Sequence, residues 1–322
     1  MAATLKCDTI QNASSSTANL TLDDAGNATV GNTLVMGSSF KRNRLINGNM
    51  GVWQRGTSFS SIATATYFSD RWFSNLGGTA PTYSRSTDAP TGFQYSASLA
   101  ASSTSFMGLA QRIEAANCTD LAGQTITVSF YAKLSSGTAT GGLSVNLAYA
   151  NSADTFSSTT TIVEANVVST LTGSHVRYTY SYAMPSQVAN GLQLIIFNPN
   201  ATQTCTILIS GVQLEVGSVA TPYERQIYSD QLAQCQRYYQ LVYATIRLPV
   251  TSGASYWTQA NMLVSMRATP TATATSTYEF RANLGSVTAT AAGVNAVELQ
   301  TTATGTGDGY TTQNLIICSS EL

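Results

Sequence analysis

Charged side chains are scarce in this sequence. Asp, Glu, Lys and Arg make up 10% of its 322 residues, against about 25% in ordinary soluble domains. The formal net charge of −1 argues against nucleic-acid binding, which needs a clustered basic face. We therefore expect no nucleic-acid partner. The Ser, Thr, Ala, Asn and Gly that take the place of charge suit all-β proteins, whose strands favour Thr, Val and Tyr on half-buried surfaces.

Long apolar runs are also absent. The longest, at residues 192–197 and 315–318, have the length of a strand, well short of the about 18 residues of a membrane-spanning helix. Residues 1–30 are polar and lack the apolar centre of a signal peptide. We expect no membrane insertion and no signal peptide.

Histidine and paired cysteines are lacking as well. The single histidine, His175, does not cluster with cysteines at a zinc-like spacing, and no CxxC pair occurs. We expect reduced, buried thiols, which suit assembly in a reducing cytoplasm, and no cofactor. No acid-rich loop of the EF-hand kind is present, so the sequence assigns no metal ligands and leaves open whether a calcium ion is bound. The five cysteines are Cys7, Cys118, Cys205, Cys235 and Cys318.

Catalytic constellations are equally sparse. A nucleophile and base pair would have to use His175, which falls in a predicted strand. Glycan cleavage uses a pair of carboxylates as general acid and base, but the sixteen acids are dispersed. Only Asp23 and Asp24 adjoin, in a turn, where Asp is favoured in any case. The sequence therefore predicts a protein that is not an enzyme.

A dense series of short β-strands fills residues 41–222. Turn signals such as Gly141-Gly142, Asn190-Gly191 and Asn198-Pro199 separate them at short intervals. Ten strands without intervening helices predict an all-β fold, a jelly-roll β-sandwich. The expected strands are 50–54, 70–74, 83–86, 93–100, 107–112, 126–134, 143–149, 176–184, 192–197 and 205–216.

A change of pattern closes this domain at residues 211–240. Val212, Leu214 and Val216 alternate with polar residues, so the stretch starts as a strand with one apolar face. Gly217 and Pro222 break it. A short linking helix is predicted next, with Ser229 as its N-cap. Its apolar stripe is expected at Leu232, Cys235, Tyr239 and Val242.

A second β-rich unit is predicted after the helix, so that residues 223–322 form a helix plus a C-terminal β tip domain. Few large apolar side chains are available to it, and we expect neighbouring subunits to complete its thin core. Residues 304–310 carry three glycines and predict a flexible, exposed loop. The expected strands are 245–248, 257–264, 271–280, 286–291, 296–300 and 315–318.

Residues 1–40 predict an N-terminal stem or attachment segment. Short strands are expected at residues 9–12, 20–22, 29–30 and 34–35, with a hairpin turn at 23–27. The segment has too few apolar residues for a core of its own. Its strands should pair with other copies or with another protein; the alternative is a disordered N-terminus.

Four motifs in order resemble bacteriophage tail-fibre and other virion appendage proteins. They are "NRLINGNMGVWQRGTSF" at 43–59, "DRWF" at 70–73, "GVQLEVGSVATPYERQIYSDQLAQCQRYYQ" at 211–240 and "SMRATPT" at 265–271. In that family a jelly roll similar to carbohydrate-binding modules ends in a "vQLEvG..aTpye" junction. The resemblance implies structural roles for Trp53, Asp70, Arg71, Trp72, Leu214 and Pro222, with Trp53 and Trp72 in the core and Asp70 and Arg71 as an ion pair or turn anchor.

The resemblance also implies a virion fibre, a tail fibre above all, that forms a homotrimer and binds a host cell-surface glycan non-covalently. Residues 1–40 would join it to other virion proteins. Two alternatives remain: a purely architectural head fibre, collar or baseplate component without a ligand site, and a secreted carbohydrate-binding module. The absence of a signal peptide weighs against the last.

Aromatic residues supply the candidate sugar contacts, because sugar CH faces stack on exposed rings. Tyr256 and Trp257 follow a Gly/Ser loop and could lie at an outer rim; packing or a trimer interface is the alternative. Tyr178, Tyr180 and Tyr182 alternate along one strand and form a stripe. The alternative is that this stripe is the inward face of the sandwich.

Overall fold

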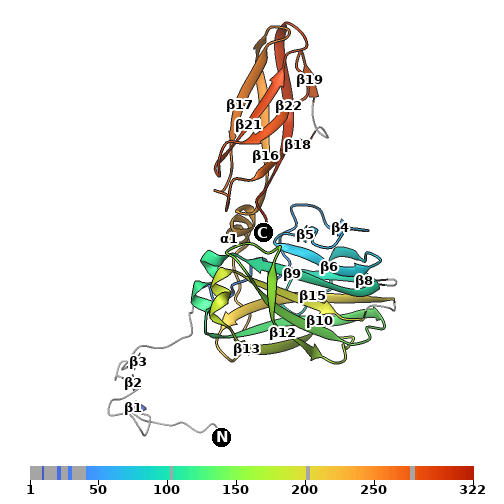
Figure 1. The fold of residues 1–322 in the computed structure, drawn as a ribbon, viewed down its shortest axis with the longest axis vertical. Coiled ribbons are helices and arrows are strands. Elements are labelled where there is room, and N and C mark those ends of the chain that lie inside the picture. Colours follow the sequence, from blue (N-terminus) through green and yellow to red (C-terminus); the bar gives the residue numbers. More distant parts are fainter. Residues whose placement is uncertain are drawn as a thin grey trace. The chain divides into compact units, whose positions relative to one another are not determined.

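The chain folds into two units, residues 1–42 and 43–322. The computed structural model describes residues 9–10, 20–22, 28–30, 41–101, 104–200, 204–275 and 280–322 (Figure 1). The all-β prediction is confirmed, since nearly every regular element is a strand. Within the described part of the chain, no helix is long and apolar enough to cross a membrane.

The first unit contains a small antiparallel sheet. Its strands are β1 (Thr9–Ile10), β2 (Leu20–Leu22) and β3 (Ala28–Val30), in the order β1-β2-β3. Leu20 lies opposite Val30, so the predicted pairing of the second and third strands is confirmed. The expected turn at 23–27 and strand at 34–35 lie outside the described residues.

A jelly roll of two six-stranded antiparallel sheets begins the second unit. The first sheet runs β13 (Val176–Ala183), β10 (Thr125–Gly137), β15 (Cys205–Val216), β8 (Ser96–Ala101), β7 (Thr82–Ser86) and β4 (Ser58–Phe59). The second runs β12 (Thr159–Val168), β11 (Leu143–Ala150), β14 (Leu192–Asn198), β9 (Thr104–Ile113), β6 (Trp72–Gly78) and β5 (Tyr67–Ser69). Three short 3₁₀ turns, η1 (Ala115–Asn117), η2 (Thr119–Leu121) and η3 (Ser186–Asn190), join strands.

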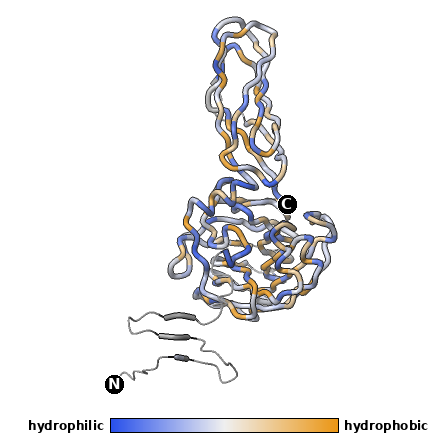
Figure 2. The backbone as a smooth tube through the Cα atoms, turned by 90° about the vertical axis from the view of Figure 1, so that its left-hand side faces the viewer, coloured by the Kyte–Doolittle hydropathy of each residue, from blue (hydrophilic) through white to orange (hydrophobic). Residues whose placement is uncertain are grey.

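The jelly-roll core follows from apolar residues that recur at every second position along many of these strands. Apolar residues spaced two apart point to one face, and those of both sheets are buried against each other. Figure 2 shows hydrophobic and hydrophilic stretches alternating along the backbone. The innermost side chains include Phe130 and Val128 of the first sheet and Leu147, Leu194 and Trp72 of the second, all 0% exposed.

The predicted strand at 50–54 is wrong, and three strands of this domain, β4, β5 and β12, were not predicted. Residues 50–54 form no strand, because the side chain of Asn47 accepts hydrogen bonds from the amides of Gly51 (2.8 Å) and Val52 (2.9 Å) and holds a turn. Asn47 and Met50 both have positive φ there. The sequence of β12 gave no clear signal, because its first three residues, "TTT", are exposed at the sheet edge and show no apolar alternation.

Residues 212–215 of β15 are buried on both faces, whereas Val216, the last residue of the strand, is exposed. Gln213 and Glu215 are 0% and 2% exposed, although their alternation with Leu214 and Val216 suggests a solvent face. Glu215 accepts hydrogen bonds from the Thr221 amide (2.9 Å) and hydroxyl (2.6 Å) and from the Gln213 amide group (2.8 Å). The Gln213 oxygen in turn accepts from the Glu224 amide (2.7 Å). The junction motif therefore folds back onto its own strand.

Helix α1 (Tyr228–Gln236) follows, as expected, but two details of the prediction are wrong. Its N-cap is Ile227, without a side-chain cap, and Ser229 lies inside the first turn. Its buried residues are Gln231 and Cys235. Tyr239 and Val242 belong instead to β16 (Tyr239–Val250), because the chain turns at Arg237.

The C-terminal β unit is a second, smaller sandwich. One of its two sheets, called the third sheet after the two of the jelly roll, runs β16, β22 (Gly307–Ser319) and β18 (Thr271–Thr275). Strand β19 (Phe280–Ala282) also pairs with β22. Its fourth sheet runs β17 (Ser255–Asn261), β21 (Ala296–Thr302) and β20 (Thr288–Ala291). The predicted loop at 304–310 is wrong in its second half, where β22 already begins.

This sandwich buries a core of its own. Val297, Leu299, Ile316 and Cys318 are 0% exposed and pack with small aliphatic residues of both sheets. A single chain therefore closes the unit, so a thin core is not a reason for it to need neighbouring subunits.

The cysteines match the expectation of buried thiols. Cys118, Cys205, Cys235 and Cys318 are free and buried, and burial raises the pKa of the Cys118 thiol to about 12. Burial likewise raises the pKa of Cys318 to about 11. Cys7 lies outside the described residues. Such thiols are poor nucleophiles, because the reactive form is the thiolate.

A buried ion network joins the C-terminal sandwich to the jelly roll. Glu321, which follows β22, pairs with Arg55 at 2.8 Å and also with Arg71, whose side chain is 1% exposed. Arg55 and Arg71 each stack on a ring of the segment after α1, over Tyr239 and Tyr238 respectively, at 3.6 Å. One carboxylate thus holds two guanidinium groups between the domains.

We predict that Glu321→Gln lowers the free energy of unfolding by about 3–5 kcal/mol, because it leaves two largely buried cations with one fewer counter-charge. Urea denaturation followed by circular dichroism measures the change. Asp308→Asn is the matched control: its pair with Arg247 is exposed, so its loss should cost less than about 1 kcal/mol. Equal effects of the two variants would contradict the prediction.

Candidate functional site

Trp257 lies in the middle of β17, on the outer face of the fourth sheet. Alternation along the strand places Trp257 and Gln259 outward and Tyr256 and Thr258 inward. The indole is 58% exposed, unusual for a large ring in a strand. It is therefore available to a partner molecule.

Polar side chains surround this ring on the neighbouring strands. Gln300 lies directly opposite Trp257, and Glu298 lies opposite Gln259. Thr288 of β20 lies opposite Gln300. All are exposed, and we call this surface, Trp257, Gln259, Thr288, Glu298 and Gln300, the tryptophan face. A flat ring flanked by amides, one hydroxyl and one carboxylate offers stacking and hydrogen bonds without strong charge.

Tyr256 does not belong to that face. Its ring packs against the core of the C-terminal sandwich, and its hydroxyl accepts a hydrogen bond from the Thr251 amide at 2.8 Å. The structure thus places the two adjacent aromatic residues on opposite faces of one sheet.

The tyrosine stripe lies on β13, the edge strand of the first jelly-roll sheet. Tyr178 and Tyr180 stand opposite Phe130 and Val128, which are core residues, and both pack against the core. The stripe therefore faces inward at the open edge of the sandwich. Tyr182 is 38% exposed and stacks on Tyr180 at 6.3 Å between ring centroids, so only its outer end offers a free ring.

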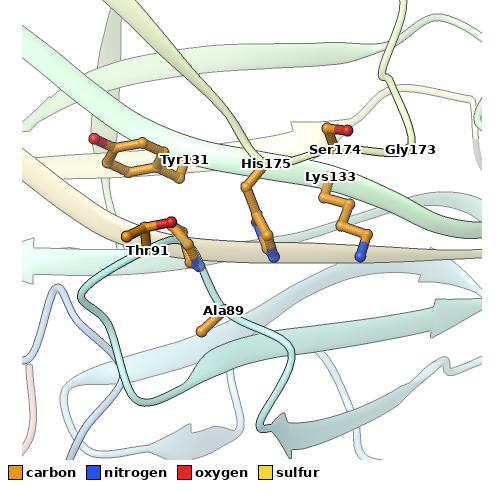
Figure 3. A pocket seen from close by; sticks show the side chains of 8 residues that line it. Ala89, Thr91, Tyr131, Lys133, Gly173, Ser174 and His175 are labelled. Atoms are coloured by element: carbon orange, nitrogen blue, oxygen red, sulfur yellow. The ribbon is translucent and has the colours of Figure 1, made fainter.

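A pocket with a volume of about 390 Å³ lies near the end of the first sheet (Figure 3). Three segments far apart in sequence line it: the loop at 89–91, the outward residues Tyr131 and Lys133 of β10, and the loop at 173–175 with His175. Asp88 stands beside it. Its carboxylate accepts a hydrogen bond from Lys133 Nζ at 2.5 Å and lies 3.1 Å from His175 Nε2.

The charges in this pocket balance. The hydrogen bond from Lys133, and to a smaller degree that from His175, lowers the pKa of the Asp88 carboxyl below its ordinary value, so this group is ionised at neutral pH. Lys133 supplies the opposite charge. The pocket therefore presents strong donors and acceptors with little net charge. Sequence analysis did not bring these residues together, because no local motif links the three segments.

The residues predicted to be structural are placed as follows. Trp53 and Trp72 are 9% and 0% exposed, and their indole N–H groups donate to the backbone oxygens of Met50 and Asn47 at 2.8 and 2.9 Å. Leu214 is fully buried, and Pro222 is exposed in the folded-back segment.

Asp70 and Arg71 do not pair with each other. Asp70 accepts hydrogen bonds from the Gln54 amide and side chain and lies 3.4 Å from Arg55, whereas Arg71 pairs with Glu321. Arg71 has a φ of 68° in the turn between β5 and β6. Among the described residues, no group of three or more His, Cys, Asp or Glu is placed to hold a metal ion.

Comparison with known proteins gives distant likenesses in fold only. No family model matches the chain, and no curated protein does. The solved structures that resemble it include the CBM22-1 xylan-binding domain of Paenibacillus barcinonensis Xyn10C, at 17% identity and a TM-score of 0.35 over 51% of this chain and 94% of that one.

Two further solved structures are similar at the same level. The enzymatically active domain of bacteriophage CBA120 tailspike protein 4 matches at 14% identity and a TM-score of 0.36, over 55% of this chain and 22% of that one. TmCBM61 in complex with β-1,4-galactotriose matches at 13% identity and a TM-score of 0.33, over 55% of this chain and 99% of that one. At these values the likeness assigns neither a family nor a ligand.

We predict that acrylamide quenches the fluorescence of Trp257 but hardly that of Trp53 and Trp72, because only the first indole is exposed. The Trp257→Phe variant should keep a blue-shifted emission with a Stern–Volmer constant several-fold below that of the unmodified protein. If the unmodified protein resists quenching as strongly as the variant, another copy or partner covers the tryptophan face in solution.

Proposed function

We propose that this chain is a bacteriophage virion fibre protein, most simply a tail fibre, that attaches the particle to host-surface polysaccharide without cleaving it. The observation that supports this most directly is the tryptophan face, a large exposed ring on a rigid sheet with amides and a hydroxyl beside it. Residues 1–40 would connect the chain to other virion proteins, so the protein would be located in an external appendage of the virion.

The physical properties of the tryptophan face suit reversible attachment. A ring on an open sheet contacts one face of a sugar and leaves the other in water, so each contact is weak. Several such sites on one particle raise the overall affinity through effective concentration, by about 10²–10⁴ over a single site. A particle held in this way binds firmly, while each single contact can still release.

Replacement of the ring tests this role. Trp257→Ala should abolish binding to host-derived polysaccharide on a glycan array and to whole host cells, while Trp257→Phe should retain part of it. Tyr228→Ala is the matched control, because Tyr228 is 61% exposed but lies on α1. Binding that survives Trp257→Ala would rule out the tryptophan face as the glycan site, whereas no binding to any host-derived glycan would favour the purely architectural role.

The proposed homotrimer has a candidate surface on the third sheet. On its outer face, Leu241 of β16 lies opposite Ile317 of β22, and Tyr243 lies opposite Leu315. Tyr243 is 64% exposed and the other three are half-buried. Threonines of β18 adjoin them, and no charged side chain occupies these paired positions. An uncharged, apolar sheet face of this kind is what a second copy of the chain would cover.

Sedimentation equilibrium should therefore give three times the 33.9 kDa chain mass. Tyr243→Lys should reduce the mass to that of one chain without unfolding it, because the ring contributes little to the core of its own chain and a buried lysine would oppose assembly. A monomeric unmodified protein at micromolar concentration would exclude the homotrimer.

A further inference from the structure

We infer that the pocket beside Asp88, Lys133 and His175 is a second ligand site, which takes one neutral sugar unit through two neighbouring hydroxyls. This site is separate from the tryptophan face and rests on the proposed function only in taking a saccharide as its ligand. Its volume of about 390 Å³ lies near the lower end for small-molecule sites, which suits one ring rather than an extended chain.

The ion pair provides the recognition. Asp88 accepts and Lys133 donates within one 2.5 Å contact, so one ligand hydroxyl can donate to the carboxylate while its neighbour accepts from the ammonium group. Hydrogen bonds to ionised groups are about twice as strong as neutral ones. Because the two charges cancel, the pocket gives no net attraction to an acidic or a basic ligand.

The fold presents an aromatic ring beside that pair. Tyr131 follows a register shift between β10 and β15, at Ser129/Tyr131, and such irregularities redirect a side chain. Gly211 of β15, with a φ of 61°, leaves room for the Tyr131 and Phe93 rings. A Cβ at this position would stand 2.9 Å from the Tyr131 ring and 2.8 Å from the Phe93 ring. Phe93 supports the Tyr131 ring at 5.5 Å between centroids. Gly211 opens the junction motif, so this motif also positions the pocket wall.

Further hydrogen-bonding groups remain for a ligand. Thr91 and Ser174 expose hydroxyls on either side of the pocket (Figure 3). A ring placed against Tyr131 would meet donors and acceptors on three sides, as a polyhydroxylated ligand requires.

His175 makes the site directly observable. It is the only histidine in the chain, so its imidazole Cε1–H gives a single proton NMR signal from the pocket. The probes are methyl glycosides of glucose, galactose, mannose and rhamnose, with methyl glucuronide and inorganic phosphate as anionic probes. We expect at least one neutral glycoside to shift this signal saturably, with a dissociation constant in the millimolar range, and the anions to have no effect.

Matched variants separate this site from the tryptophan face. Asp88→Asn and Lys133→Met should weaken the saturable shift by about tenfold or more, and both positions are exposed enough to leave the fold intact. Asp308→Asn, at another exposed ion pair, and Trp257→Ala should leave it unchanged. A shift that persists in Asp88→Asn, saturation by an anion, or no response to any neutral glycoside would overturn the inference, whatever the outcome for Trp257.

Discussion

The buried carboxylate of Glu215 fixes the course of the chain where it leaves the jelly roll after β15. It accepts three hydrogen bonds, two of them from Thr221, and a hydrogen bond to an ionised group contributes about 1.5–3 kcal/mol. The Gln213 side-chain oxygen accepts a hydrogen bond from the Glu224 amide. Together, Glu215 and Gln213 hold residues 221–224 against β15 directly after the strand ends, and we call this set of contacts the clamp. Without these donors, a carboxyl group at 2% exposure would be buried without hydrogen bonds, which is costly.

Several other features depend on that clamp. It brings Tyr223 onto Phe93, at 5.0 Å between ring centroids, and Phe93 supports the Tyr131 wall of the pocket. The clamp also directs the chain into α1. After this helix, the rings of Tyr238 and Tyr239 stack against Arg71 and Arg55, the two arginines that pair with Glu321. The pocket and the domain junction are therefore both built outward from one folded-back segment.

The sequence predicts those parts of the fold in which one local pattern decides the outcome. Alternation at Ile126, Val128 and Phe130 reports a strand and its buried face, and the polar, glycine-marked turns separate the strands. It fails where distant segments decide. The pattern at Gln213 and Glu215 predicts a solvent-facing side, but residues 221–224 cover both side chains. Residues 50–54 form a turn instead of a strand because the Asn47 side chain binds their amides. The edge strand β12 has too little buried surface to show a pattern. The pocket was not predictable, because Asp88, Lys133 and His175 become neighbours only through sheet pairing and loop placement.

The scarcity of charge connects the two proposed ligand surfaces. The tryptophan face carries Glu298 as its only charge, and the pocket pairs Asp88 with Lys133, so neither creates a strong long-range field. Recognition would then depend on ring stacking and on hydroxyl hydrogen bonds, which act at contact and are little affected by salt, unlike attraction between exposed charges. A sugar is the common class of ligand that offers both an apolar face and dense hydroxyls without charge. The low charge that led us to expect no nucleic-acid partner therefore also suits a surface that binds uncharged polysaccharide.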